Sequence, residues 1–521
     1  MHGRFWIKCT AALISAIVAG ATLPIASLGA TSDSAPPVVR VEQGMLRGVQ
    51  IDGGRSFRGV PFAAPPVGAL RWRRTEPPAR WTGVRDATRF GLPCAQPDLG
   101  WNGVKTTGSS EDCMTLNIWA PTGARTLPVM VWIHGGAFQG GSGVDPMFDG
   151  TALMKHGVVV VTLNYRLGVL GFLTHPDLAA ETADHGSGDY GFYDQVEALR
   201  WVQRNIARFG GDPHRVTLFG QSAGAASVGA LMTSPLAKGL FSRSIIESGP
   251  PFGLGHYRTA AESEAPGRAW GSVADLRKLP VETLIASWAR FASANPAEHT
   301  ATPVVDGNVI TQSPDAAFAA GAASSMASII GNNSREALGP PGAGDLDRSY
   351  GTEAQAAHAI YDGAPADPVI GDGPSQLATD VTFRCPTVMT QTARAAAGNA
   401  VFAYQFEEPL PGRRDLGAGH SFELPYVFGN LSPGGFMGGD FSADERALSA
   451  QMQSYWTNFA KSGDPNGDGL PHWGRFNPQT ADYMILAVGR VGTLQGLRAR
   501  PCSLYRRNWE ATHHQSIARA E

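Results

Sequence analysis

Residues 216–228 have the pattern of a buried strand that turns directly into a helix. The run Val216-Thr-Leu-Phe219 is apolar and β-prone, the turn reads Gly220-Gln-Ser222-Ala-Gly224, and a helix rich in small residues follows. Such a sharp turn holds its central residue in a strained conformation, and the two glycines remove side chains that would collide across it. Ser222 is therefore predicted to present its hydroxyl at the carboxyl end of a sheet, in front of a helix N-terminus that favours negative charge. A glycine-rich turn with an ordinary serine is the alternative.

Two further apolar runs indicate the kind of sheet to which this strand belongs. Residues 129–133 and 158–163 are continuously apolar, as in parallel strands that are covered on both faces. Apolar residues recur with helical spacing across 193–209, so strands and helices alternate and predict an α/β fold. The chain has 521 residues, 43% of them hydrophobic, which is enough for a large core. We find no internal repeat and no change of composition that divides the chain, so a single domain is predicted from 36 to 521.

The N-terminal segment, residues 1–30, has the pattern of a secretory signal peptide. Arg4 and Lys8 form a positive region, an apolar stretch follows from Cys9 on, and cleavage is expected near Ala30. The residues before Cys9 do not form a lipoprotein motif, so no stable membrane anchor is expected. A buried helix or an uncleaved anchor is the alternative. The predicted location is secreted or periplasmic.

The charge balance argues against a nucleic-acid partner. Lys and Arg number 42 against 45 Asp and Glu, which gives a net charge of -3, whereas nucleic-acid-binding proteins normally carry a strong basic excess. No internal stretch reaches the 18 or so apolar residues of a membrane span. Composition thus favours a soluble, enzyme-sized protein over a nucleic-acid or membrane protein.

Two long motifs resemble signatures of the type B carboxylesterase family, which includes cholinesterases and bacterial para-nitrobenzyl esterases. Residues 209–224 (FGGDPHRVTLFGQSAG) are similar to its serine signature, and residues 111–121 (EDCMTLNIWAP) to its second signature, with Met114 where Leu is usual. The likeness also covers shorter segments, at 58–72, 164–166, 303–307 and 456–466. The resemblance implies an α/β-hydrolase fold, with a large, mostly parallel sheet flanked by helices and with loop and helical insertions that form an active-site gorge. It also implies a serine esterase that forms an acyl-serine intermediate.

A loop after the predicted strand 129–133 has the composition of an oxyanion hole. It reads His134-Gly-Gly-Ala137 and resembles the corresponding loop of the family. Acyl transfer needs backbone N–H groups aimed at the oxyanion, and small residues let the backbone approach the substrate. By resemblance the donors are the N–H groups of Gly136, Ala137 and Ala223, with His134 a structural member of the loop. A tight turn without this role is the alternative.

The catalytic base and acid should follow the serine in the order acid, then histidine. His420 lies in the segment 419–430 (GHSFELPYVFGN), which resembles the catalytic-histidine segment of the family. Glu336 lies in the loop after a predicted strand at 327–330, and this loop resembles the acid loop of the family, although Ala337 stands where Gly is common. Asp306 is the second candidate for the acid. The predicted triad is Ser222, Glu336 and His420.

Four cysteines remain once Cys9 has left with the signal peptide, and an even number in an exported chain suggests two disulfides. The spacing leaves all three connectivities open, and four buried free thiols are the alternative. The family resemblance implies that Cys94 pairs with Cys113 and Cys385 with Cys502.

The same resemblance assigns supporting roles to residues around the site. Ser248 would hydrogen-bond near the acid of the triad. Buried structural ion pairs would join Arg71 to Glu111 and Arg166 to Asp194.

Two features suggest other ligands but do not support them. Residues 464–469 (DPNGDG) match the first half of a calcium loop, but its twelfth position would be Arg475 instead of the glutamate that binds calcium. Trp101 suggests a cation site like that of cholinesterases, but Gln221 stands where those enzymes carry an acidic residue. Trp101 is therefore predicted to be a packing or rim residue. Neither a metal nor a cofactor is expected.

The leading prediction is a secreted serine carboxylesterase whose partner is a small-molecule ester. The sequence does not fix the acyl group, the alcohol or the oligomeric state. A specialised esterase for an unusual ester, such as a mycotoxin, drug or polyester, is the first alternative. The second is a non-catalytic adhesion protein of the same fold, which a complete candidate triad disfavours.

Overall fold

The computed structural model describes residues 35–101, 104–253, 257–295, 301–336, 345–431 and 437–520, with side chains as far as 513. The predicted signal peptide, residues 1–30, lies outside the described residues. Contacts group Pro36–Glu521 into one compact unit.

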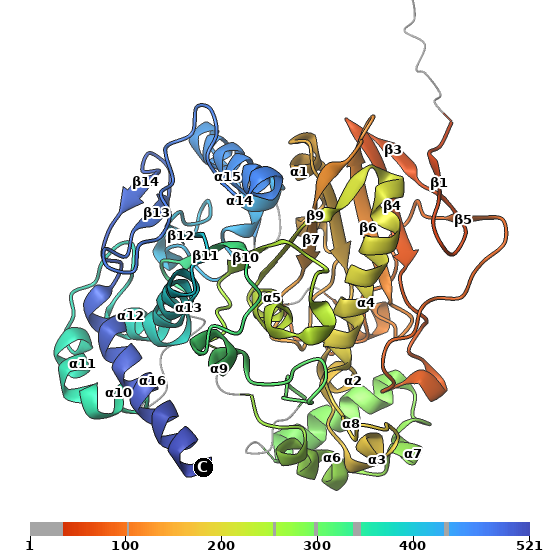
Figure 1. The fold of residues 1–521 in the computed structure, drawn as a ribbon, viewed down its shortest axis with the longest axis horizontal. Helices are drawn as coiled ribbons and strands as arrows, with labels where there is room; N and C mark the ends of the chain where they lie inside the picture. The colour runs from red at the N-terminus through yellow and green to blue at the C-terminus, as the bar shows by residue number, and fades with distance from the viewer. Residues whose placement is uncertain are drawn as a thin grey trace, which may run out of the picture. The chain divides into compact units, whose positions relative to one another are not determined.

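A sheet of eleven strands forms the centre of the described part of this unit (Figure 1). Its order is β14-β13-β12-β11-β10-β9-β7-β8-β6-β4-β3, and neighbours from β13 to β8 pair parallel. The remaining pairs, at the two edges, are antiparallel. The strands are β3 (Val49–Ile51), β4 (Gly54–Pro61), β6 (Thr115–Pro121), β7 (Leu127–Ile133), β8 (Val159–Leu163), β9 (Gly211–Gln221), β10 (Arg243–Glu247), β11 (Ala327–Asn333), β12 (Val401–Phe406), β13 (Tyr483–Leu486) and β14 (Gly492–Leu494). The predicted large, mostly parallel sheet is confirmed, and a small second sheet holds β1 (Val38–Arg40), β2 (Met45–Arg47) and β5 (Val84–Asp86).

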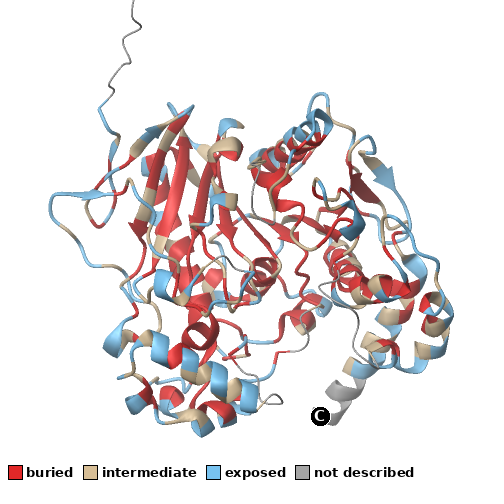
Figure 2. Cartoon of the chain, turned by 180° about the vertical axis from the view of Figure 1, so that it is seen from behind, coloured by how far each residue is buried: buried red, intermediate tan, exposed pale blue. Residues whose placement is uncertain are grey.

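Residues of the central strands alternate between two hydrophobic cores, one on each face of the sheet. In β7, Val129, Val131 and Ile133 belong to one core, and Met130 and Trp132 belong to the other. Helices that supply the first core are α4 (Tyr190–Asn205), α5 (Ala223–Thr233) and α13 (Cys385–Ala396). Those that supply the second are α1 (Thr151–Lys155), α14 (Leu424–Phe428) and α15 (Ala443–Ser462). Because both faces are covered, the central strands β7, β8, β10, β11 and β12 are almost wholly buried (Figure 2), which explains their continuously apolar sequences.

The predicted strands all fall within observed strands or overlap them: 129–133 in β7, 158–163 in β8, 216–219 in β9 and 327–330 in β11. The helix predicted at 193–209 differs at both ends. It begins at Tyr190 and ends at Asn205, and a 3-10 turn, Ile206–Phe209, follows it. The chain leaves this turn through Gly210, whose φ of 91° is a left-handed conformation that glycine adopts without strain.

The other helices of the described residues occupy the connections between strands and the C-terminal region. They are α2 (Gly168–Phe172), α3 (Pro176–Ala180), α6 (Glu264–Trp270), α7 (Val273–Leu276), α8 (Val281–Ala294), α9 (Pro314–Ala319), α10 (Asp345–Tyr350), α11 (Ala354–Tyr361), α12 (Gly373–Thr379) and α16 (Ala499–Ala520). A π-helical turn, Asp380–Arg384, joins α12 to α13. Within the described ranges, no helix has the length and apolar character needed to cross a membrane.

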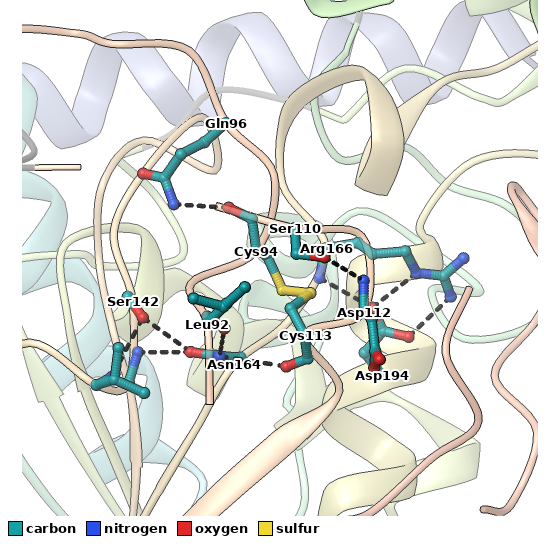
Figure 3. Close-up of a disulfide and its surroundings, with 12 residues drawn as sticks. Leu92, Cys94, Gln96, Ser110, Asp112, Cys113, Ser142, Asn164, Arg166 and Asp194 are labelled. Carbon is teal, nitrogen blue, oxygen red and sulfur yellow. Dashed lines mark hydrogen bonds and ion pairs between the residues drawn. A yellow bond between two sulfur atoms is a disulfide. The ribbon is translucent and has the colours of Figure 1, made fainter. Parts of the chain in front are cut away.

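The two disulfides have the pairing that the resemblance implied. Cys94 and Cys113 are bonded next to Asn164, whose side-chain amide donates to the Cys113 carbonyl (Figure 3). Cys385 and Cys502 join α13 to α16.

Both expected ion pairs are also formed and buried. Arg166 Nη2 lies 2.7 Å from Asp194 Oδ1, and Arg71 Nη2 lies 2.6 Å from Glu111 Oε2. Arg71 also donates to the carbonyls of Leu276 and Leu279, so this pair fastens the insertion after β10 to the N-terminal part of the domain.

Candidate active site

Ser222 lies between the last residue of β9 and the first residue of α5, in the strained turn that the sequence predicts. Its φ of 56° and ψ of -126° are unfavourable for a residue with a side chain. A Cβ on Gly220 would lie 2.6 Å from the Gly224 backbone, and a Cβ on Gly224 would lie 2.0 Å from the Ile133 carbonyl oxygen. The turn can therefore be this tight only because both positions are glycine. Ser222 N donates to the carbonyl of Glu247 on β10, which fixes the turn to the neighbouring strand.

His420 and Glu336, the predicted base and acid, are in direct contact. Nδ1 of His420 lies 2.6 Å from Oε2 of Glu336, whose side chain is fully buried, while that of His420 is 9% exposed. Burial alone would lower the pKa of His420, but the hydrogen bond and charge of Glu336, together with the charge of Glu423, outweigh it and raise the pKa above its usual value. The pair can thus stabilise the imidazolium that forms when a serine proton is taken.

The second ring nitrogen of His420 faces the nucleophile turn. Its Nε2 lies 3.3 Å from the side-chain nitrogen of Gln221, the residue directly before Ser222. Because Glu336 occupies Nδ1, the nitrogen at the turn is the one that would exchange a proton with substrate or serine. Phe383, from the π-helical turn, also contacts His420, with 4.9 Å between the centroids of the two rings.

The predicted oxyanion loop follows β7 and lies against the nucleophile turn. A Cβ on Gly135 would lie 2.6 Å from the Gln221 carbonyl oxygen and 3.0 Å from the Ser222 Cβ, so the two backbones are in close approach. Gly136 and Ala137 both have positive φ, 112° and 53°. The N–H of Ala223 is the first of α5 and has no acceptor within the helix. All three predicted donors therefore belong to backbone segments next to Ser222.

His134 is a buried structural member of the oxyanion loop, as expected. Its ring is buried and stacks on Tyr165 at 4.4 Å, and Nδ1 lies 2.8 Å from the Gly135 carbonyl oxygen. Burial, only partly offset by that hydrogen bond, lowers the pKa of His134 to about 4, so the ring is neutral at physiological pH. Tyr165 in turn donates to the His134 carbonyl and braces the loop.

Asp306, the second candidate for the acid, forms its hydrogen bonds with residues other than His420. Its carboxylate accepts hydrogen bonds from Tyr193 Oη at 2.7 Å and from the backbone of Asn308 and Ile310. It thus shapes a loop between α8 and α9, while Glu336 is the carboxylate on His420.

Ser248 does not form the hydrogen bond expected near the acid. It directly follows β10 with a φ of 51°, and its backbone N–H donates to the Gly331 carbonyl at 2.9 Å. Among the described residues its Oγ is buried without a hydrogen-bond partner. The contribution that the structure shows for Ser248 is its backbone hydrogen bond, which joins the end of β10 to β11.

Three buried polar residues behind the triad were not predicted. They are Glu247 at the end of β10, Asn333 at the end of β11, and Glu423, three residues after His420. Burial, together with the charge of Glu423, raises the pKa of Glu247 well above its usual value. A sequence signal existed only for Glu247, as an acidic residue at the end of an apolar run; the other two read as loop residues.

The features that suggested other ligands remain without support. Asp464 accepts hydrogen bonds from the backbone and side chain of Asn466 and so forms a turn. Across the described ranges, no group of three or more His, Cys, Asp or Glu is arranged to hold a metal ion. Trp101 is 61% exposed, so it is not a packing residue.

Comparisons with known proteins identify the family of this chain. A sequence model of the Carboxylesterase family matches residues 35–343 and 362–505. Fumonisin B1 esterase of Sphingopyxis macrogoltabida is 37% identical over 514 residues, which covers 92% of this chain and 92% of the relative. Para-nitrobenzyl esterase of Bacillus subtilis is 36% identical over 470 residues, with 86% and 94% coverage. Among solved structures, a carboxylesterase of Geobacillus stearothermophilus has a TM-score of 0.78 and 35% identity, covering 90% of this chain and 99% of that structure.

The family match spans most of the chain, and the relatives are aligned over nearly their whole length. The solved structure has the same fold, and its 35% identity to this chain is high enough to indicate relatedness beyond a shared fold. The chain therefore belongs to the Carboxylesterase family and is a carboxylic ester hydrolase with the α/β-hydrolase fold.

Proposed function

We propose that the enzyme hydrolyses esters with Ser222 as nucleophile, His420 as general base and acid, and Glu336 as the group that orients His420. Ser222 Oγ attacks the ester carbonyl carbon while its proton passes to Nε2 of His420. The N–H groups of Gly136, Ala137 and Ala223 receive the tetrahedral oxyanion.

The second half of the reaction uses the same groups. Collapse of the intermediate breaks the ester C–O bond, and the alcohol leaves with the proton from His420. A water molecule then gives a proton to His420 and attacks the acyl-serine, and the second collapse releases the carboxylic acid and returns the proton to Ser222. The main support is the 2.6 Å contact between His420 and Glu336, with the other ring nitrogen at the nucleophile turn.

A panel of p-nitrophenyl esters from acetate to palmitate, without added metal or cofactor, tests this proposal. The same panel shows which acyl chain length the enzyme prefers. We expect hydrolysis by the wild type and a loss on the order of 10⁴ or more in kcat for Ser222→Ala. An organophosphate should modify Ser222 stoichiometrically, as read by peptide mass spectrometry. Ser244→Ala is the matched control: it removes a hydroxyl on β10 that pairs with Ser328 on β11, and the variant should remain active. Modification of a different residue, or activity lost on chelation, would contradict the proposal.

A specialised substrate is a second candidate. The relative named fumonisin B1 esterase matches this chain over 92% of both sequences, so the likeness is not confined to the catalytic motifs. Incubation with fumonisin B1, followed by mass spectrometry, tests it directly. Ester cleavage with a kcat/KM far above that for p-nitrophenyl butyrate would support a specialised role, and equal or lower values would favour a general carboxylesterase.

We also propose that the protein is exported and that residues 36–521 fold as a single domain. The two disulfides fit an extracellular protein, and residues 1–30 have the signal-peptide pattern. We expect the protein in the periplasmic or extracellular fraction, with a mature N-terminus near residue 31. A chain of residues 31–521 should fold and be active by itself. Retention of residues 1–30 in the active protein would contradict cleavage.

A further inference from the structure

Asn333 is the one buried side chain in the described structure that joins the acid loop to the histidine loop through two hydrogen bonds. It is the last residue of β11 and is fully buried. Its side-chain nitrogen Nδ2 lies 2.7 Å from the carbonyl oxygen of Gly419, the residue before His420, and 2.5 Å from Oε2 of Glu423. Both N–H groups of a carboxamide are therefore used by the segment that contains His420.

The backbone of the same residue holds the acid. Asn333 N donates to Oε1 of Glu336 at 2.6 Å, which leaves the other carboxylate oxygen, Oε2, for His420. Asn333 thus holds one carboxylate oxygen of Glu336, and it also holds the Gly419 carbonyl and the Glu423 carboxylate on either side of His420 in the chain. An apolar side chain of the same size would leave the Gly419 carbonyl and the Glu423 carboxylate without this donor.

Glu423 adds a second carboxylate behind His420. Burial first, and then the charge of Glu336, raises the pKa of Glu423 to about 7, while the hydrogen bond from Asn333 lowers it. The titratable groups that interact with it are Glu336, His420, Glu247 on β10 and Tyr404 on β12. The charge of Glu423 in turn favours the protonated form of His420.

We propose that Asn333 is a positioning residue for the reaction, which acts through Glu423 and Gly419 to set the place and the basicity of His420. This inference deepens the proposed function and rests on it. The amide favours the ionised form of Glu423 by donating to it, and it keeps the His420 loop in register with the acid by donating to Gly419.

Asn333→Leu tests the proposal, because leucine has a similar shape but no donor. We expect kcat to fall about 10²-fold with KM changed less than about threefold, as for a catalytic group displaced by about 1 Å. Without the donor, the pKa of Glu423 rises, so Glu423 stays protonated and neutral up to a higher pH. Because its negative charge is then missing, the pKa of His420 falls. The acid limb of the kcat/KM profile should therefore move about 0.5–1 pH unit to lower pH.

Glu423→Gln separates the two effects, since a glutamine keeps an acceptor for Asn333 but has no charge. Its acid limb should move in the same direction, while kcat at pH 8 stays within about fivefold of the wild type. Ser328→Ala is the matched control: it removes a buried hydrogen bond from the other end of β11 and should change neither kcat nor the limb. An unmoved limb in both Asn333→Leu and Glu423→Gln would overturn the proposal.

A readout without turnover distinguishes failure of this inference from failure of the proposed function. The Nδ1 proton shared by His420 and Glu336 should give a far-downfield proton resonance whose pH dependence reports the pKa of His420. A shift of that titration in Asn333→Leu supports the positioning role even if the esters tested are poor substrates. A titration identical to that of the wild type contradicts it, whatever the esterase activity.

Discussion

Gln221 and His420 meet at the nucleophile turn, with the side-chain nitrogen of Gln221 3.3 Å from Nε2 of His420. Gln221 is the last residue of β9 and is buried, so its amide is held against the base by the same turn that presents Ser222. The neighbour of the proton-accepting nitrogen is therefore polar but neutral. A charge introduced at this position would act on the pKa of His420 and on the attraction of cationic substrates.

Gln221→Glu should raise the pKa of His420 further, because a carboxylate within hydrogen-bond reach favours imidazolium. We expect the acid limb of kcat/KM to move up by about 1 pH unit, as measured with p-nitrophenyl butyrate. The wild type should prefer choline esters over isosteric neutral esters by less than about tenfold, or about 1.4 kcal/mol, and the variant should increase this ratio. Gln221→Leu is the neutral control. A strong choline preference in the wild type would reveal another anionic or aromatic site.

The pH dependence of the wild type tests the assignment of the base. The pKa of His420 is raised, so its neutral, proton-accepting form is lost as pH falls through a value above about 6.5. We expect kcat/KM to fall about tenfold per pH unit below that value and to be level above it. An acid limb that persists unchanged in the residual activity of His420→Ala would exclude His420 as its source.

Replacement of the acid separates Glu336 from Asp306. Glu336→Gln cannot stabilise the imidazolium on Nδ1, and kcat should fall by about 10²–10⁴. Asp306→Asn keeps an acceptor for Tyr193 and should retain activity of the same order as the wild type. Steady-state kinetics of the two purified variants is the measurement. The reverse result would show that the acid is misassigned.

The sequence predicted what depends on local pattern. Continuous apolar runs predicted the central strands, and the glycine spacing around Ser222 predicted the turn. The strands and the turn could be predicted because each depends on residues that are neighbours in the chain. Glu336 and His420 are 84 residues apart. Their contact depends on β11 and β12 being neighbours in the sheet, so only resemblance to a family could pair them.

The network around Asn333 and Glu423 could not be predicted for a physical reason. Polar residues after a strand usually lie in solvent or cap a turn, and their sequence looks the same when tertiary packing buries them. Glu423 is fully buried and accepts a hydrogen bond from Asn333, which lies 90 residues earlier in the chain. Ser248 shows the converse, since the side-chain hydrogen bond that the resemblance implied is not formed among the described residues.

The two disulfides should differ in their effect on stability. In the chain-entropy description, a cross-link stabilises more when it closes a longer loop: about 3 kcal/mol for a separation of 19 residues and about 5 kcal/mol for 117. Replacing Cys385 and Cys502 together by serine should therefore lower Tm more than replacing Cys94 and Cys113. Differential scanning calorimetry of the two double variants measures this. The opposite order would mean that loss of native packing, and not loop length, decides the stability.

Gly224→Ala should disable the enzyme through backbone geometry alone. The added Cβ would lie 2.0 Å from the Ile133 carbonyl oxygen and 2.9 Å from the His134 backbone, so α5 must move away from the oxyanion loop. Overpacking of this kind costs about 1–3 kcal/mol of stability, and a displacement of Ser222 by about 1 Å would reduce kcat by about 10²-fold. Gly108→Ala is the control, because no atom lies within 4 Å of its added Cβ and its φ is not positive. Circular dichroism verifies that both variants are folded, and kinetics with p-nitrophenyl acetate compares them. Full activity of folded Gly224→Ala would show that the close approach of the turn and the oxyanion loop is not required for catalysis.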